Sequence, residues 1–200
     1  MRAIYPWFIP TIILRLRFFY CSCRKQAAHF GFHSCQGNPM PDSITATINA
    51  RLTQLGISLP EPPVPAGAYR RIVIRNGIGF ISGQFPLVDG ELAYAGCVGA
   101  ELTEDQGRLA ARIAAINVLA QIHGHLGGFE GFAGLLRIEG YVASAAGNFS
   151  QPKVLDGASD LLVAVLGPEL GAHARTAFSV AQLPLGAPVE LAVSFAMAAT

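Results

Sequence analysis

Two charged side chains lie near the C-terminal end of the chain, each inside a segment that is otherwise mostly small and apolar. Arg175 lies within residues 173–180 (HARTAFSV), and Glu190 lies within residues 189–193 (VELAV), with no other acid after Glu169. Burial of a charge on a strand that is apolar on both faces costs free energy unless the charge forms an ion pair or takes part in binding or catalysis. A guanidinium group can bind a carboxylate through two parallel hydrogen bonds. An acid in apolar surroundings has a raised pKa, which suits proton transfer near neutral pH.

The simplest explanation for these two charges is a buried ion pair between them. If the last two predicted strands form a hairpin that closes symmetrically, Arg175 pairs with Ala196 and Glu190 pairs with Ala181. The two charged groups are then on the order of 20 Å apart along the hairpin. In that arrangement they cannot neutralise each other, so each needs another partner, and we expect a neighbouring subunit to supply it.

Three other features offer weaker candidate sites. His123 and His125 stand two residues apart on a predicted helix, so their side chains point away from each other and no metal site is expected there. Cys97 has neither a basic neighbour nor a paired histidine in the sequence, which favours a buried structural thiol. The glycines follow no nucleotide-binding pattern between a strand and a helix, and they indicate turns.

Residues 1–39 differ in composition from the rest of the chain, because they carry five basic side chains, three of the four cysteines and no acid. Their apolar run is too short and too interrupted for a membrane-spanning helix. The cysteines and histidines of this segment, which match no usual zinc-finger spacing, are Cys21, Cys23, His29, His33 and Cys35. We expect residues 1–39 to be a disordered leader, or the protein to start at Met40.

The composition of the 200-residue chain indicates a folded domain rather than a disordered one. Apolar residues make up 52% and charged residues 14%, where about 25% charged is usual, so part of the surface is expected to be covered in an oligomer. Residues 40–200 carry nine basic and 13 acidic groups, which does not favour nucleic-acid binding. A single cysteine in this part of the chain fits a reducing compartment, so we expect a cytoplasmic protein.

The first part of the domain is predicted to contain a helix and a hairpin. Residues 43–55 have helical apolar spacing, with Ser43 as the N-cap and Gly56 as the stop. The proline-rich residues 60–65 exclude helix. Strands are predicted on both sides of Asn76-Gly77, because both residues of this turn tolerate positive φ.

The second part is predicted to contain two long helices and three strands. Thr103 to Gln106 form a capping box that opens a helix running to about Leu126. We expect the buried stripe of this helix to be Leu109, Ile113, Ile116, Ala120 and Ile122. The remaining predicted elements are a strand at 135–144, a helix at 154–166, and strands at 174–181 and 189–197. This order predicts an α+β fold with the helices on one face of a mixed sheet.

Two blocks of the sequence resemble the RidA/YjgF family of reactive intermediate deaminases, formerly named endoribonuclease L-PSP. The first is residues 80–86 (FISGQFP), which is similar to the family's Ser-Gly-Gln-x-Pro strand end. The second runs from Arg175 through Leu183-Pro184 to Glu190 and is similar to the family's signature at matching spacing. The resemblance covers roughly residues 69–197, so we divide the chain into a leader (1–39), a helix with a connector (40–66) and a RidA-like domain (67–200).

This resemblance implies a chorismate mutase-like fold that assembles as a homotrimer with clefts between subunits. It implies that Arg175 binds the carboxylate of a 2-imino or 2-enamino acid, and that Glu190 positions or deprotonates the attacking water. Ser82 and the main chain at Gly83 help to hold the substrate, and Tyr69 lines the cleft. No metal or organic cofactor is implied, and neither a nucleic acid nor a membrane is expected as a partner.

Three features depart from the family pattern. Ala177 stands where the family commonly has a cysteine, and Asp156 is the nearest match to an asparagine often found in the second helix. The helix at 43–55 lies outside the minimal family domain and suggests a divergent branch. The resemblance therefore favours hydrolytic deamination of 2-imino or 2-enamino acids to 2-keto acids and ammonia. The alternatives are a non-catalytic trimer that binds small carboxylates or regulates a partner and, less favoured, an endoribonuclease.

Overall fold

The computed structural model describes residues 43–62 and 67–199. The proposed leader, its cysteine and histidine residues and Met40 therefore lie outside the described residues. The elements, in chain order, are α1 (Ile44–Gln54), β1 (Ile72–Arg75), β2 (Ile78–Gln84), β3 (Leu87–Val88), β4 (Glu91–Leu92), α2 (Glu104–Leu126), β5 (Phe132–Ala143), α3 (Gln151–Leu166), β6 (Ala174–Val180), the 3-10 turn η1 (Pro184–Gly186) and β7 (Val189–Met197).

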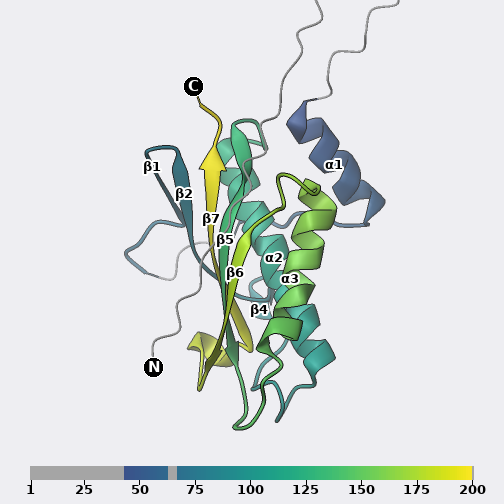
Figure 1. Ribbon diagram of the computed structural model, residues 1–200, viewed down its shortest axis with the longest axis vertical. Helices are drawn as coiled ribbons and strands as arrows, with labels where there is room; N and C mark the ends of the chain where they lie inside the picture. The colour runs from purple at the N-terminus through teal and green to yellow at the C-terminus, as the bar shows by residue number, and fades with distance from the viewer. Residues whose placement is uncertain (1–42, 63–66, 200) are drawn as a thin grey trace, which may run out of the picture. The chain divides into compact units, whose positions relative to one another are not determined.

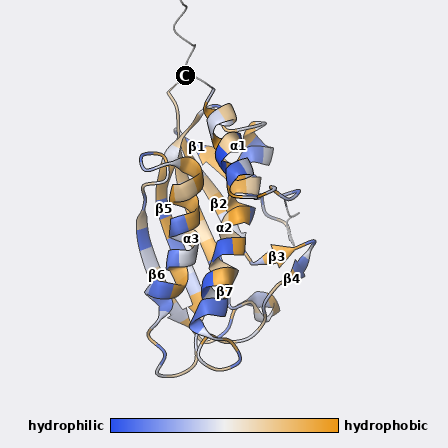
Figure 2. Ribbon diagram, turned by 90° about the vertical axis from the view of Figure 1, so that its right-hand side faces the viewer, coloured by the Kyte–Doolittle hydropathy of each residue, from blue (hydrophilic) through white to orange (hydrophobic). Residues whose placement is uncertain are grey.

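The main sheet has five strands in the order β1-β2-β7-β5-β6, and α2 and α3 lie together on one face of it (Figure 1). Figure 2 faces this helix layer, in which the two helices run side by side. Every strand pair is antiparallel except β5 with β6, which is parallel. The α+β class and the mixed sheet with two long helices on one face, both predicted from the sequence, are confirmed.

The predicted hairpin at the start of the domain is present. β1 pairs with β2 in antiparallel register, and Asn76 and Gly77 form the turn with φ angles of 51° and 75°. These positive angles are the ones that a tight turn requires and that asparagine and glycine tolerate. The shorter β3–β4 hairpin turns at Asp89 and Gly90 in the same way.

The last two strands do not form the hairpin expected from the sequence. β6 pairs only with β5 among the described strands, and β7 lies between β5 and β2. The chain from β6 therefore passes across the end of β5 before it returns as β7. The turn contains Leu185, whose φ of 62° is unusual for a side chain without a short polar group. The symmetric register that would place Arg175 opposite Ala196 is wrong for this reason.

Helix α2 begins and ends as predicted, and its expected buried stripe is confirmed in part, because Ala120 and Ile122 are buried and Ile113 and Ile116 are partly buried. Both hydrogen bonds of the capping box are made, and Gly127 ends the helix in the left-handed conformation with a φ of 69°. Leu109, expected to be buried, is 48% exposed, whereas the alanines of the helix face the core. The fully buried alanines of this face are Ala110, Ala111, Ala114 and Ala115.

The alanine face has a packing reason. A Cβ at Gly157 of α3 would collide with the carbonyl of Arg108 on α2, so the two helices approach each other at backbone distance. Small side chains allow this approach, whereas a stripe of leucines and isoleucines would hold the helices apart. Larger apolar side chains of α3, of the sheet and of the C-terminal half of α2 (Val118, Leu119 and Ile122) form one core with these alanines.

Helix α1 joins the same core at its edge. Ser43 accepts a hydrogen bond from the Ala46 amide (3.1 Å) and caps the helix. Ile48 and Leu52 are buried and belong to the main core cluster, and Arg51 donates a hydrogen bond to the Val165 carbonyl near the C-terminal end of α3 (3.4 Å). The N-terminal helix predicted from the sequence is thus part of the folded domain rather than an appendage.

Candidate functional site

The sheet face opposite the helices carries Glu190. Along β7, Val189 and Leu191 point into the core, so Glu190 points away from the helices, opposite Tyr141 of β5. Within the described residues no helix covers this face. Glu190 is half-buried there, and desolvation raises the pKa of its carboxyl group above the ordinary value. The raised pKa expected from the apolar strand is therefore present.

The main chain of Gly83 lies directly against the Glu190 carboxyl group. A Cβ at Gly83 would collide with Glu190 Oε1, so only glycine leaves room for the carboxyl group in this position. The pairing of β2 with β7 has a register shift between Ile81 and Gln84. This bulge contains Ser82 and Gly83, the two residues that the sequence analysis placed in the site. The structure therefore brings Gly83 and Glu190 together, as the family resemblance implies.

A buried network of amide side chains holds this end of β2 in place. Gln84 donates a hydrogen bond to the Ser82 carbonyl (2.8 Å) and accepts one from Gln121 of α2 (3.3 Å). Asn117, one helical turn earlier on α2, donates to the Phe85 carbonyl (2.9 Å). Gln84, Asn117 and Gln121 are all buried. Sequence reasoning missed this network, although two amides four residues apart in an apolar stretch of helix were a detectable signal.

Arg175 lies on the helix-covered side of the sheet, at its outer edge. It is in register with the buried Ile138 of β5. Its Nη1 donates one hydrogen bond to Asp156 Oδ1 and another to Ser159 Oγ, each at 3.0 Å. The side chain of Arg175 is 23% exposed and that of Asp156 is 45% exposed. The structure thus places the predicted Asp156 beside Arg175, whereas sequence reasoning missed Ser159.

Arg175 and Glu190 do not meet within one chain. They are in register with Ile138 and Tyr141 of β5 respectively, on opposite faces of the sheet. Three residues along the strand and two strand spacings across the sheet separate their Cα atoms by about 14 Å. The expectation that Arg175 would need a neighbouring subunit to neutralise it is wrong, because Asp156 of the same chain does so. Among the described residues, Glu190 forms no ion pair.

The remaining sequence candidates take part in none of the contacts described above for the side chains of Glu190 and Arg175. Tyr69 is 52% exposed, close in the chain to Arg70, whose carbonyl accepts a hydrogen bond from the Ser82 hydroxyl (2.7 Å). Ala177 is partly buried against the core. Cys97 is a free, partly buried thiol. No cluster of three or more potential metal ligands exists in the described parts of the chain.

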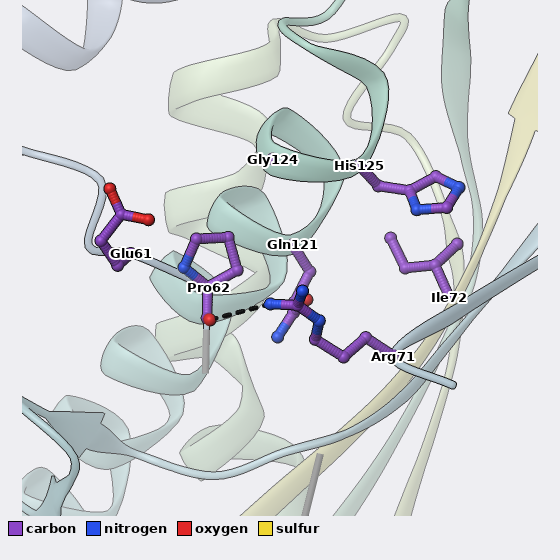
Figure 3. A pocket seen from close by; sticks show the side chains of 7 residues that line it. All are labelled: Glu61, Pro62, Arg71, Ile72, Gln121, Gly124 and His125. Carbon is purple, nitrogen blue, oxygen red and sulfur yellow. Dashed lines mark hydrogen bonds between the residues drawn. The ribbon is translucent and has the colours of Figure 1, made fainter. Parts of the chain in front are cut away.

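A cavity of about 510 Å³ lies elsewhere, between α2, the start of β1 and the chain at Glu61 and Pro62 (Figure 3). Its lining consists of Glu61, Pro62, Arg71, Ile72, Gln121, Gly124 and His125. Arg71 reaches across it and donates a hydrogen bond to the Pro62 carbonyl (3.0 Å). A Cβ at Gly124 would collide with the Pro62 ring, which explains the glycine between the two histidines. Apart from Gln121, the cavity shares no residue with the two groups described above.

Comparison with known proteins agrees with this geometry. The mixed sheet with helices on one face has the chorismate mutase-like fold. Residues 49–197 match the family described as "YjgF/chorismate mutase-like, putative endoribonuclease". Protein TCP17 of Trypanosoma cruzi is 39% identical over 144 residues, which are 72% of this chain and 90% of TCP17. The chain therefore belongs to the RidA/YjgF family.

Two solved structures are similar in both sequence and fold. A protein of unknown function from Agrobacterium tumefaciens is 34% identical, with a TM-score of 0.71, over 77% of this chain and 94% of that chain. A "putative endoribonuclease" from Shewanella oneidensis is 33% identical, with a TM-score of 0.72, over 75% of this chain and 99% of that chain. The family match begins inside α1, so this helix belongs to the matched region.

None of the helices described here has the length and apolar character that crossing a membrane requires.

Proposed function

We propose that the protein hydrolyses reactive 2-imino or 2-enamino acids to 2-keto acids and ammonia. The observation that carries this proposal is the half-buried Glu190 carboxyl group, which has a raised pKa and lies against the main chain of Gly83. Arg175 supports it, because only Nη1 of its guanidinium group is used within the described chain. Nε and Nη2 form the edge that can bind a substrate carboxylate with two parallel hydrogen bonds.

In the proposed reaction, Arg175 binds the carboxylate of the imino acid and so fixes the position of the C=N carbon. The Glu190 carboxylate takes a proton from water as the water oxygen forms a bond to that carbon and the C=N electron pair moves to nitrogen. Glu190 then returns the proton to the nitrogen of the tetrahedral intermediate. Glu190 then transfers the hydroxyl proton of this intermediate to the nitrogen as the C–N bond breaks, so that ammonia leaves and a 2-keto acid remains. A carboxyl group with a raised pKa suits both proton transfers.

One small substrate cannot contact Arg175 and Glu190 of the same chain, because they lie on opposite faces of the sheet. We therefore place the site between two subunits of a homotrimer, with Arg175 from one subunit and Glu190 from the other. Large apolar side chains on the uncovered sheet face support this assembly, since burial against another copy would stabilise it. Two of them are Phe80, which is 53% exposed, and Phe178, which is 42% exposed.

The alternative function is a binding protein without catalysis. The contact of Asp156 with Arg175 favours it, because a carboxylate of the protein already occupies part of the anion-binding group. Binding of 2-oxobutanoate, measured as a thermal shift, without any acceleration of imine hydrolysis would support this alternative. Titration of RNA binding against salt tests the endoribonuclease function that the family description carries.

The test of the proposed function is a coupled assay of 2-iminobutanoate hydrolysis with the full-length chain. We expect wild-type protein to accelerate the reaction, Arg175→Ala to abolish the acceleration, and Glu190→Ala to reduce it severely. Asp160→Asn is the matched control, because Asp160 forms an exposed ion pair with Arg108. Wild-type protein that accelerates the hydrolysis of none of several imino acids would overturn the proposal.

A further inference from the structure

The guanidinium group of Arg175 is held from one side by two residues of α3. Asp156 and Ser159 stand three residues apart, which places them on one face of the helix, and both accept a hydrogen bond from Nη1. Ser159 is itself fixed by a hydrogen bond with His173 (3.0 Å). This arrangement fixes the plane of the guanidinium group and leaves its Nε–Nη2 edge without a partner in the described chain.

We propose that Asp156 makes the Arg175 site selective for ligands that carry a cationic nitrogen beside their carboxylate. This inference depends on the proposed function only in that Arg175 binds the ligand carboxylate. Asp156 and Arg175 together have no net charge, so a ligand with only a negative charge meets a carboxylate as well as a guanidinium group. A zwitterionic ligand, such as a protonated imino acid, offsets that repulsion with its own positive charge.

The size of this selectivity follows from the geometry. A ligand carboxylate on the free edge of the guanidinium group would lie roughly 6 Å from the Asp156 carboxylate, because each is one hydrogen bond away from the same planar group. Both groups are partly exposed to water, so their repulsion is reduced but not removed. Removal of the Asp156 charge is expected to raise the affinity for a simple anion by about fivefold. For a zwitterion the same change removes the repulsion of the ligand carboxylate and also the attraction to the ligand nitrogen, so the affinity should change little.

The test compares two ligands of the same carbon skeleton, 2-oxobutanoate and 2-aminobutanoate, by calorimetry on the full-length protein. In wild-type protein 2-aminobutanoate should bind more tightly relative to 2-oxobutanoate than it does in Asp156→Asn. In this variant the affinity for 2-oxobutanoate should increase about fivefold relative to the affinity for 2-aminobutanoate. Asp156→Glu, which keeps the charge, and Asp160→Asn, which removes a charge one helical turn away, should keep the wild-type ratio.

The ratio separates selectivity from simple positioning of Arg175. If Asp156 only positions the guanidinium group, Asp156→Asn weakens both ligands equally and the ratio stays unchanged, which overturns the inference. An unchanged ratio in a protein that still hydrolyses 2-iminobutanoate overturns the inference alone. Absence of both binding and hydrolysis in wild-type protein removes Arg175 as the carboxylate anchor, and the proposed function fails together with the inference.

Discussion

The contact between Gly83 and Glu190 leads to a sharp prediction for the variant Gly83→Ala. The added Cβ would occupy the position of Glu190 Oε1, and the carboxyl group lies on an uncovered sheet face where it can move away. A displacement of about 1 Å at a reacting group costs on the order of 100-fold in rate, or about 2.7 kcal/mol. We therefore expect kcat for 2-iminobutanoate hydrolysis to fall about 100-fold, with a smaller change in KM.

The variant should also be slightly less stable, because the Glu190 side chain must leave its preferred rotamer. Such a change costs roughly 0.5–1.5 kcal/mol, measured as the free energy of unfolding in urea. In a Glu190→Ala background the colliding carboxyl group is gone, so Gly83→Ala should have little further effect on stability. Wild-type kcat in Gly83→Ala, or an equal destabilisation in both backgrounds, would refute the contact as the cause.

Two further predictions concern Glu190 and the buried amides. Because the folded state raises the pKa of Glu190, the acid limb of kcat/KM should lie above the ordinary range of a glutamic acid. As the pH rises through that pKa, the half-buried carboxyl group becomes charged and lowers the stability of the folded state. Glu190→Gln should therefore raise Tm near pH 8 but not near pH 4. The same change in Tm at both pH values would contradict this prediction. Asn117→Ala removes the hydrogen bonds that Asn117 donates to the carbonyls of Phe85 and Leu87, so it should cost about 1–3 kcal/mol of unfolding free energy and reduce kcat. The control Leu109→Ala, on the exposed face of α2, should change stability by about 0.5 kcal/mol or less; equal losses in the two variants would contradict the observed helix face.

Local signals in the sequence predicted the boundaries of the first hairpin and of α2 well, whereas β5 and α3 each begin three residues earlier than predicted. Each of three features depends on the types of a few neighbouring residues, which can be read directly from the sequence. These features are the Asn76-Gly77 turn, the capping box at Thr103 and the helix stop at Gly127. The raised pKa of Glu190 could also be predicted, because the apolar character of its strand is a local property. These features need no knowledge of how distant segments pack.

Features that depend on packing between distant segments could not be predicted in the same way. The β6–β7 hairpin was a reasonable expectation from a short connection, but β5 lies between the two strands and pairs with both. The partner of Arg175 comes from α3, and its approach depends on the crossover between β5 and β6. In the N-terminal half of α2 the close approach of α3 decides which residues are buried, so the apolar pattern failed at Leu109, whereas Ala120 and Ile122 are buried as predicted.

The proposed function requires Arg175 of one subunit and Glu190 of another to complete each site. The most direct test mixes two full-length variants, Arg175→Ala and Glu190→Gln, after dissociation and reassembly, and measures 2-iminobutanoate hydrolysis. Each variant alone should be nearly inactive. Random assortment into trimers leaves about a quarter of the shared sites with both intact groups, so the mixture should recover about a quarter of the wild-type rate. A reassembled mixture as inactive as its two components would contradict the shared site.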